Sequence, residues 1–479
     1  MLGAVRVLVG SCQLRGGVCC LLLARRIPPV FTEKGADSAL DPSLAARAAE
    51  AFIYGFPLVF DLQEVARFAR SGIGAVAATP FNQFGHAPTL AGPETDFVSI
   101  NNDTVYSIAN VDTSGGPVRL DVPDSHGRYY VLQFVDAWTN NFAYVGHRAT
   151  GTKAGAFLLV GPGWAGDTPD DATVVRFPTT IATIVGRWAV DGKSDMPAVR
   201  ELQSALDLTP TAAGSGIPEP DPGVPEELRF FESLRRWMRA FPPAERDLAY
   251  QQRFEPLGLM AADSPYLDPD PGLAAALRDG LAAARAGLEQ ALKDSPSPKQ
   301  NGWDLTYHIF DYNLDFFEIG ALDDERWKLD DGPGRYLQRA GAARGGLWGN
   351  HGYEAAYAMV YVDGAGEALD GSYTYELRFM SPPPCGAFWS VTMYDATDFY
   401  LVENPIERYS IGDRTPGLAT SDDGSFTIVF EHDQPSDADR RANWLPTPTG
   451  TFRPLLRIYE PDDAIFDGSW ELPPVTRTG

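Results

Sequence analysis

Cysteine is scarce in this sequence of 479 residues, which contains only Cys12, Cys19, Cys20 and Cys385. Three of the four stand within the first twenty residues, away from any segment that reads as folded. Because stabilising disulfides join segments of a folded domain, we do not expect a disulfide framework here.

Long hydrophobic runs are also missing. The first 26 residues carry two short apolar patches, VRVLVG and VCCLLLA, which arginines interrupt, whereas a membrane-spanning helix needs about 20 apolar residues in a row. We interpret residues 1–36 as a disordered segment or as a targeting segment with a weak export signal. A cytoplasmic location is favoured over export, and no stable membrane insertion is expected.

Positive charge is the third shortage. Lysine and arginine number 39 against 64 aspartate and glutamate residues, which gives a net charge of −25. Such a field repels phosphate backbones, so nucleic acid is not expected as a partner. The six histidines stand singly along the chain, and we therefore predict no metal site.

The familiar cofactor motifs are incomplete. In GRWAVDGKS, five residues separate Gly186 from Gly192, where a phosphate loop has four. The stretch 72–77 fits G-x-G-x-x-A, but it follows a helical pattern and not a strand. The motifs G-x-S-x-G, H-E-x-x-H and C-x-x-C are absent. We accordingly predict no cofactor.

Two series of short β patterns, separated by helical ones, make up most of the chain. VRLDV, RYYVLQFVD, AFLLVGPGW and TVVRFP form the first series, and AYAMVYVD, YTYELRF, GAFWSVTMYD, SFTIVFEHD and FRPLLRIYE form the second. Turn residues at short intervals between such patterns are typical of a sandwich or a barrel. The length also calls for two or three domains. The fold class predicted is mainly β (α+β), with two β-sandwich domains.

The helical patterns set the domain boundaries. We predict a leading helix from Asp41 to Gly72, kinked or split by Gly55 and Pro57. Further helices are expected at 226–241, 272–293 and 336–347, with a linker at 209–225. The predicted regions are residues 1–36, an N-terminal β-sandwich domain with its helix at 37–195, a helical insert and linker at 196–345, and a C-terminal β-sandwich domain at 346–479.

The longest motifs resemble a known pair of domains. NNDTVYS, DVPDSHGRYYVLQFVDAWTNNFAYVG and AGAFLLVGPGW resemble the bacterial DUF1254 domain. DGSYTYELRF, PPCGAFWSVTMYDATDFYLVENPIERYSIGDRT, NWLPTPTGTFRPLLRIYEP and WELPPV resemble its partner, the DUF1214 domain. The resemblance implies two jelly-roll-like β-sandwiches with attached helices, and it implies no settled activity. Two stretches, YHIFDYNLDFFEIGALDDERW and GGLWGNHGYEAAY, depart from the family pattern.

Polar residues concentrate at the ends of apolar strands between Ser99 and Trp164. Asp103 and Asp136 are the candidate proton-transfer groups, because two carboxylates in unequal environments can divide acid and base roles. Tyr394, in the second β series, is a third candidate catalytic residue. Turn formation alone also explains an aspartate such as Asp103.

A second set of residues is predicted to bind and orient the substrate. Arg148 could hold a substrate carboxylate or pair with Asp136, and the two roles are equally compatible with the sequence. Alternating aromatic residues in the second series are also typical of a sandwich core. The predicted binding residues are Asn101, Asn102, Tyr106, Asn140, Asn141, Arg148, Trp389, Arg408 and Tyr409.

Two functional hypotheses follow. The first is an enzyme of hydrolase or lyase type, which acts on a small organic molecule by carboxylate and tyrosine acid–base chemistry in a cleft between the two sandwiches. The second is a non-catalytic protein that binds carbohydrate or another small polar ligand, with structural Ca²⁺ held by Asp and Asn oxygens. The exposed sheet edges of two sandwiches are compatible with a homodimer.

Overall fold

The computed structural model describes residues 43–95, 99–293, 297–320, 327 and 334–479. Helix α1 (Leu44–Ser71) opens the described chain, and the side chain of Ser43 accepts a hydrogen bond from the Ala46 N–H. The helix ends where Gly72 takes a φ of +82°, a conformation that favours glycine. Asp41, the predicted start, lies outside the described residues.

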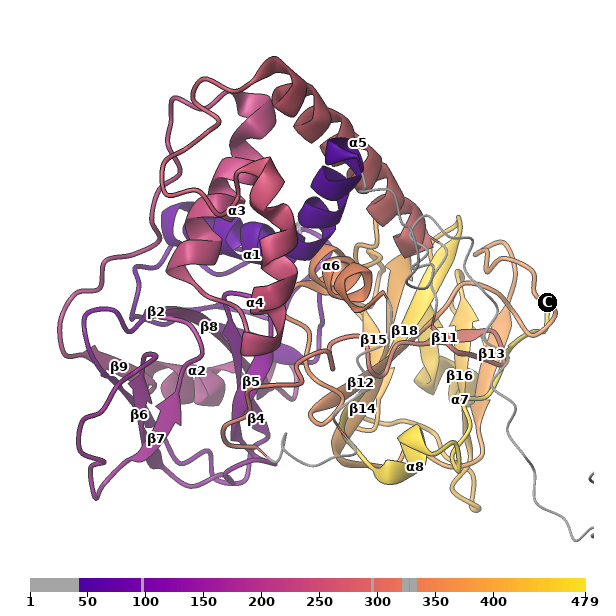
Figure 1. Cartoon of the computed structure of the whole chain (residues 1–479). Coiled ribbons are helices and arrows are strands. Elements are labelled where there is room, and N and C mark those ends of the chain that lie inside the picture. The colour runs from indigo at the N-terminus through magenta and orange to yellow at the C-terminus, as the bar shows by residue number, and fades with distance from the viewer. Residues whose placement is uncertain (1–42, 96–98, 294–296, 321–326, 328–333) are drawn as a thin grey trace, which may run out of the picture. The chain divides into compact units, whose positions relative to one another are not determined.

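The predicted split of α1 is wrong, because the helix continues through Gly55 and Pro57. Its axis bends along its length in Figure 1. A Cβ at Gly55 would lie 2.3 Å from a methyl carbon of Leu234 in α3 (Arg229–Ala240). This glycine therefore permits a close approach of two helices, and tertiary packing offsets the hydrogen bond that Pro57 cannot make.

Two sheets form the N-terminal sandwich. The larger has the order β1-β2-β8-β4-β5 and the smaller has the order β7-β6-β3-β9. All neighbours are antiparallel except β6 and β7. Apolar residues from both sheets and from α1 share one core. The strands are β1 (Gly85–His86), β2 (Thr104–Asp112), β3 (Val118–Val122), β4 (Tyr130–Asp136), β5 (Asn141–Gly146), β6 (Gly155–Val160), β7 (Thr173–Arg176), β8 (Ile181–Ala189) and β9 (Asp207–Pro210).

The C-terminal sandwich has the same plan. Its larger sheet has the order β10-β11-β12-β18-β14-β15, and its smaller sheet has the order β17-β16-β13-β19. A second apolar core lies between them. The strands are β10 (Lys299–Gln300), β11 (Trp303–Leu305), β12 (Ala355–Val360), β13 (Tyr375–Phe379), β14 (Cys385–Asp395), β15 (Ser410–Gly412), β16 (Phe426–Glu431), β17 (Trp444–Pro446), β18 (Phe452–Pro461) and β19 (Val475–Arg477).

The remaining helices gather largely around α1. Helices α3, α5 and α6 contact α1, and Figure 1 shows them as a group beside the two sandwiches. Among the described residues, no helix is both long enough and apolar enough to cross a membrane. The helices are α2 (Met196–Ser204), α4 (Glu245–Gln251), α5 (Pro271–Lys293), α6 (Arg335–Gly346), α7 (Ala438–Ala442) and α8 (Asp463–Phe466), besides α1 and α3.

The fold class predicted from the sequence, α+β with a large β content, is confirmed. The predicted boundaries at 195 and 345 are displaced. Strand β9 lies beyond the first boundary but pairs with β3, and strands β10 and β11 lie inside the predicted insert but extend the sheet of β12. These edge strands have only two to four residues, too short for a recognisable alternation.

The larger sheets of the two sandwiches face each other. On β18, Leu456 and Ile458 point into the C-terminal core, while Arg457 and Tyr459 point to the opposite face. Asn101 of the N-terminal sandwich donates a hydrogen bond to the Tyr459 hydroxyl over 3.2 Å. The contact between the sandwiches therefore includes polar side chains, beside an apolar cluster in which Val131 and Ala189 meet Ala355 and Phe388. We call these polar side chains the polar layer: Tyr106, Tyr129, Gln133, Tyr144, Arg187, Glu354, Tyr357, Arg457 and Tyr459.

Candidate anion and proton-transfer site

The polar layer is organised by one loop, residues 348–354, which enters β12. The Gly349 carbonyl accepts hydrogen bonds from Gln133 Nε2 at 2.7 Å and from Asn141 Nδ2 at 3.1 Å. The His351 N–H donates to the Tyr144 hydroxyl over 2.8 Å. These bonds fix the loop of the C-terminal half against β4 and β5, and we call it the bridging loop.

Position 349 of the bridging loop requires glycine, because the Phe310 ring approaches its backbone closely. A Cβ at Gly349 would lie 2.0 Å from a ring carbon of Phe310. Real Cβ atoms do not approach other atoms so closely, and the ring is itself packed beside Ala342. The WGNHGYE sequence thus brings its backbone carbonyl to the polar layer because it lacks a side chain at this position.

Arg187 is the central charge of the polar layer. It is buried, and its guanidinium donates to Gln133 Oε1 at 2.7 Å, Asn350 Oδ1 at 3.1 Å and the Trp348 carbonyl at 2.9 Å. It also lies 5.5 Å from the Tyr106 ring centroid. All of these partners are neutral, and Arg187 forms no ion pair with a carboxylate of the described residues.

One donor beside Arg187 lacks a hydrogen-bond partner. Asn350 Nδ2 is buried and donates to no acceptor within the described part of the chain, while the Oδ1 of the same amide binds Arg187. A buried unpaired guanidinium costs several kcal/mol, and an unpaired amide costs a further 1–3 kcal/mol or so. A negatively charged ligand would satisfy both groups.

Glu354 is the central acid. It is fully buried at the end of the bridging loop, and the Tyr129 hydroxyl donates to its Oε1 over 2.6 Å. Burial, the largest cause, and nearby Glu460 together raise the pKa of Glu354 to about 8. Tyr129, Arg148 and Arg187 act in the opposite direction. Glu354 is therefore mostly a neutral carboxylic acid at pH 7, which can donate a proton.

Not every side chain between the facing sheets is fully buried. Tyr106 on β2 and Tyr357 and Met359 on β12 point into the layer between the sandwiches, yet each is partly exposed. Burial of the Tyr357 hydroxyl raises its pKa. These three side chains therefore retain some contact with solvent, unlike Tyr144 and Tyr459.

Asp103 lies at one end of this region and contacts the second sandwich. Its Oδ2 accepts a hydrogen bond from Ser390 Oγ at 2.6 Å, and its carbonyl accepts one from Arg414. The Tyr394 hydroxyl donates to the Ile100 carbonyl and accepts from Arg457 at 2.8 Å. The structure thus brings Asp103 and Tyr394 to the same end of the polar layer.

Asp136 does not join Asp103, so the cavity predicted to hold both carboxylates does not exist. Thr104, next to Asp103, pairs with Ala189 of β8, whereas Asp136 pairs with Ala182. Seven residues along a strand correspond to roughly 23 Å. The sequence showed that both residues lie at strand ends, but the antiparallel order places those ends on opposite edges of the sheet.

The role of Asp136 is structural. Its Oδ1 accepts hydrogen bonds from the N–H groups of Trp138 and Asn140, both at 2.9 Å, and its Oδ2 accepts from Asn140 Nδ2. Burial raises its pKa against these hydrogen bonds. This side chain closes the turn between β4 and β5, as aspartates in turns commonly do.

Asp136→Ala should destabilise the protein by about 1–3 kcal/mol, because the turn loses its acceptors and buried N–H groups are left without partners. Asp136→Asn should cost less, since the amide keeps one acceptor oxygen. Urea denaturation of the three proteins at pH 7 measures both effects. Equal stability of the alanine variant and the parent would contradict this role.

The other predicted binding residues divide into three groups. Asn141 and Tyr106 belong to the polar layer region, as described above. Asn101 and Asn102 hold local backbone or neighbouring side chains, with Asn101 Oδ1 accepting from the N–H groups of residues 103 and 104. Asn140 only completes the Asp136 turn.

Three more of the predicted binding residues lie in the C-terminal sandwich. Trp389 lies in the C-terminal core, stacked on Phe426, because odd-numbered positions of β14 face that core. Arg408 donates to the carbonyls of Ala442 and Trp444. Tyr409 is partly exposed beside β15.

Arg148 does not form the ion pair with Asp136 that was one of the two roles predicted for it. Its guanidinium donates to the Tyr353 carbonyl, and its Cζ lies 4.3 Å from the centroid of the Tyr353 ring. No ion pair with Asp136 occurs, because Asp136 is at the other end of β4 and β5. Arg148 instead fixes the bridging loop near Glu354.

Sequence reasoning missed the residues that dominate the site. Arg187 stands in an otherwise apolar strand, IATIVGRWA, and Glu354 follows the glycine-rich WGNHGY stretch. A charged residue in the middle of a continuous apolar run was the available signal for Arg187. Glu354 had a weaker signal, its place in a stretch that departs from the family pattern.

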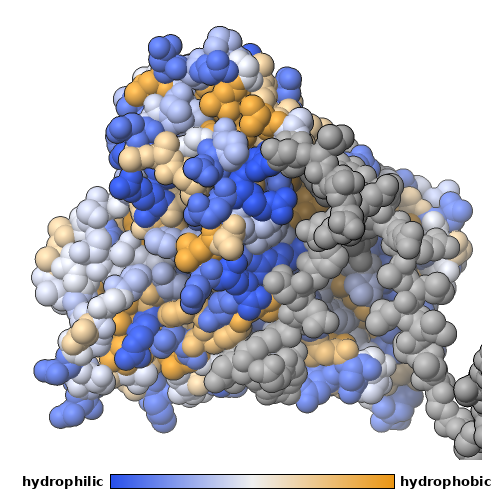
Figure 2. All heavy atoms as spheres, viewed as in Figure 1, coloured by the Kyte–Doolittle hydropathy of each residue, from blue (hydrophilic) through white to orange (hydrophobic). Residues whose placement is uncertain are grey.

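A surface hollow lies elsewhere, among the helices. It has a volume of about 840 Å³ and is lined by α1, α3, α5 and α6 residues such as Phe56, Phe60 and Phe230. Figure 2 shows apolar side chains exposed on the helical part of the visible face. The charged residues at its rim are largely solvent-exposed, so the buried polar groups identify the polar layer as the better candidate. Within the described ranges, no three His, Cys, Asp or Glu side chains are arranged to hold a metal ion.

Comparisons with protein families find two matches. Residues 81–210 match the model of DUF1254, and residues 354–463 match the model of DUF1214; both are described as proteins of unknown function. A search of the curated proteins finds no match. The two models cover most strands of the two larger sheets and include Arg187 and Glu354.

One solved structure shows a similar fold. The crystal structure of the VPA0106 protein from Vibrio parahaemolyticus has a TM-score of 0.70 and 23% sequence identity, and the match covers 91% of this chain and 100% of that chain. A putative uncharacterized protein from Burkholderia cenocepacia has a TM-score of 0.44 and 12% identity, with 91% and 94% covered. The first comparison supports the fold alone.

Proposed function

This chain is a DUF1254 and DUF1214 domain-containing protein, and we propose that it is an enzyme acting on a small organic anion between its two sandwiches. In this proposal Arg187 binds the anionic group of the substrate. Glu354, with the Tyr129 hydroxyl beside it, transfers a proton in a reaction of hydrolase or lyase type.

The observation that carries the proposal is that buried Arg187 has no counter-ion among the described residues. Proteins pair buried arginines with carboxylates or stack them in fully bonded networks. Arg187 has three neutral acceptors, no ion pair within the described residues, and an unpaired amide donor at Asn350 beside it. A planar guanidinium with an adjacent amide suits a carboxylate, which accepts two parallel hydrogen bonds.

Glu354 supports catalysis over simple binding. A neutral carboxylic acid near the ligand can donate a hydrogen bond to a bound anion, and it can also transfer a proton, which catalysis needs and binding alone does not. The raised pKa of about 8 leaves Glu354 able both to donate and to regain a proton near neutral pH, as general acid–base catalysis requires. Arg187 and Glu354 are close enough for the guanidinium to influence that pKa.

Arg187→Gln should abolish the thermal stabilisation that a bound carboxylate gives. The first experiment is a thermal-shift screen of the parent against mono- and dicarboxylates at matched ionic strength. Loss of a charge-assisted pair of hydrogen bonds weakens binding by roughly 10- to 100-fold, so a ligand that raises the melting temperature of the parent should have little effect on the variant.

Arg119→Gln is the matched control, because it makes the same charge change at an arginine that pairs with Asp121 and Asp171 at the surface. It should respond to the ligand as the parent does. An equal shift in Arg187→Gln would remove Arg187 from the site. Glu354→Gln should keep binding and lose turnover of the same ligand; if the parent does not turn the ligand over, the protein is a binding protein only.

A further inference from the structure

We infer that His147 and Glu460 form the route by which buried Glu354 exchanges its proton with solvent. The inference rests on the proposed role of Glu354 and assigns positioning and proton-transfer roles to two residues outside the proposed binding contacts. A fully buried acid that cycles during catalysis must be reprotonated, so a route to solvent is required.

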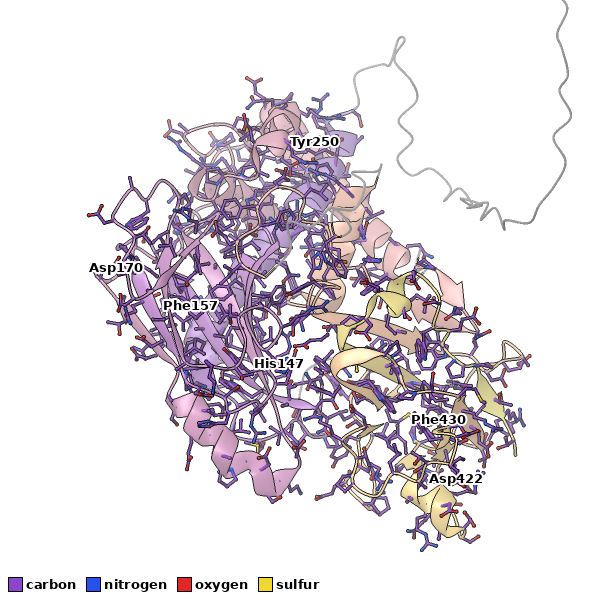
Figure 3. The ribbon with its side chains drawn as sticks, turned by 90° about the horizontal axis from the view of Figure 1, so that it is seen from below. His147, Phe157, Asp170, Tyr250, Asp422 and Phe430 are labelled. Atoms are coloured by element: carbon purple, nitrogen blue, oxygen red, sulfur yellow. The ribbon has the colours of Figure 1, made fainter. Side chains whose placement is uncertain are left out.

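The outer step of the route is a short hydrogen bond. His147 follows β5, and its Nδ1 lies 2.7 Å from Glu460 Oε1. The His147 side chain is 33% exposed, whereas the Glu460 side chain is only 7% exposed. Figure 3 shows His147 on the part of the N-terminal sandwich nearest the C-terminal strands. Histidine is the side chain best suited to exchange protons with water near neutral pH.

The inner step connects Glu460 with Glu354 through adjoining groups. The Glu460 N–H donates to the Glu354 carbonyl over 2.8 Å, which holds the two residues side by side at the ends of β18 and β12. Tyr129 donates its hydroxyl proton to Glu354, and its ring centroid lies 6.0 Å from that of His147. The influence of both glutamates on the pKa of Tyr129 places its hydroxyl near both carboxyl groups.

The backbone of Glu460 carries an independent sign of function. Its φ is +52°, a left-handed conformation that non-glycine residues rarely adopt. Such strain is concentrated at functional sites, because the surrounding structure must offset a cost of about 1–3 kcal/mol. Here the left-handed residue lies near the end of β18, and its carboxyl group contacts His147.

The other charged and titratable groups around Glu354 do not offer a route. Arg148 and Arg187 do not release protons in proteins. Unlike Tyr129, neither Tyr144 nor Tyr353 forms a hydrogen bond with Glu354 among the described residues. The path through Tyr129, Glu460 and His147 ends at a partly exposed histidine.

The test measures proton exchange directly and needs no substrate. Infrared spectroscopy of the full chain should show the C=O stretch of protonated carboxylic acids at pH 6, and the part of the band that Glu354→Gln removes belongs to Glu354. After transfer into D₂O the band shifts as deuterium replaces hydrogen. We expect His147→Gln, whose amide keeps a donor for Glu460, to slow this shift at least tenfold.

Two further variants make the result decisive. Added imidazole should restore fast exchange in His147→Gln but not in Glu460→Gln, where the inner step itself is lost. His126→Gln, at a histidine whose side chain is 83% exposed on another turn, should exchange like the parent. Parent-like exchange in both His147→Gln and Glu460→Gln would overturn the route, while leaving the proposed function intact. Absence of the Glu354 band in the parent would overturn both.

Discussion

Replacing Glu354 by glutamine should stabilise the protein above pH 7 relative to the parent and leave it nearly unchanged at pH 4. The ordinary pKa of this carboxyl group is 4.5, and burial raises it to about 8. Between these values the folded state holds a proton that the unfolded state releases. Stability of the parent therefore falls as pH rises from about 4.5, and the loss is complete above about pH 8.

The expected difference is large. A shift of 3.5 pKa units corresponds to about 5 kcal/mol at about 1.4 kcal/mol per unit. Glutamine cannot ionise and still accepts the hydrogen bond from Tyr129, so the variant lacks this pH dependence. Urea denaturation of both proteins at half-unit intervals from pH 4 to pH 9 measures the difference.

Other buried carboxyl groups also lower the stability of the parent as pH rises. The pH profile of the parent must therefore be compared with that of Glu354→Gln. Burial also raises the pKa values of Asp61 and Asp136, so the parent alone would not identify Glu354. Glu219→Gln, at an exposed loop position, is the control and should follow the parent. A parent and a Glu354→Gln variant with parallel pH profiles would show that Glu354 does not carry the raised pKa.

The same substitution at two buried arginines should have very different costs. Arg235 in α3 lies 2.8 Å from Glu232, and their side chains are 4% and 0% exposed. Arg235→Met leaves the Glu232 carboxylate buried without its counter-ion, which we expect to cost about 3–5 kcal/mol. Arg187→Met leaves only neutral acceptors behind and also removes an unpaired buried charge.

We therefore expect Arg187→Met to cost at least about 2 kcal/mol less than Arg235→Met in ligand-free protein. Urea denaturation at pH 7 provides the comparison. Arg235→Met combined with Glu232→Leu should recover part of the loss, because no charge then remains. If Arg187→Met were as damaging as Arg235→Met, Arg187 would have a counter-ion in the folded protein, and the argument for an anionic ligand would fail.

The strands could be predicted because their patterns are local. In FRPLLRIYE, apolar residues and turn signals identified β18, and the same reasoning found most long strands of both sandwiches. What the pattern did not reveal is that both faces of β18 are buried. Arg457 and Tyr459 lie on the face of β18 opposite the C-terminal core, and the docking of two sheets removes them from water.

The candidate site escaped prediction for a related reason. Asp103 and Asp136 were chosen because the first precedes an apolar strand and the second ends one, but strand direction decides which ends meet, and one sequence does not show strand order. Arg187 and Asn350 meet although 163 positions separate them. No periodicity extends over such a distance, so this contact depends wholly on the tertiary fold.

The composition of the polar layer has a consequence during synthesis on the ribosome. At about 5–20 residues per second, the bridging loop is made about 10–30 s after Arg187, from which Asn350 is separated by 163 positions. Until then the N-terminal sandwich exposes the face that will later meet its neighbour. Because that face carries arginine, glutamine and tyrosine, water solvates it, and the nascent domain is less prone to aggregate than one with an apolar face.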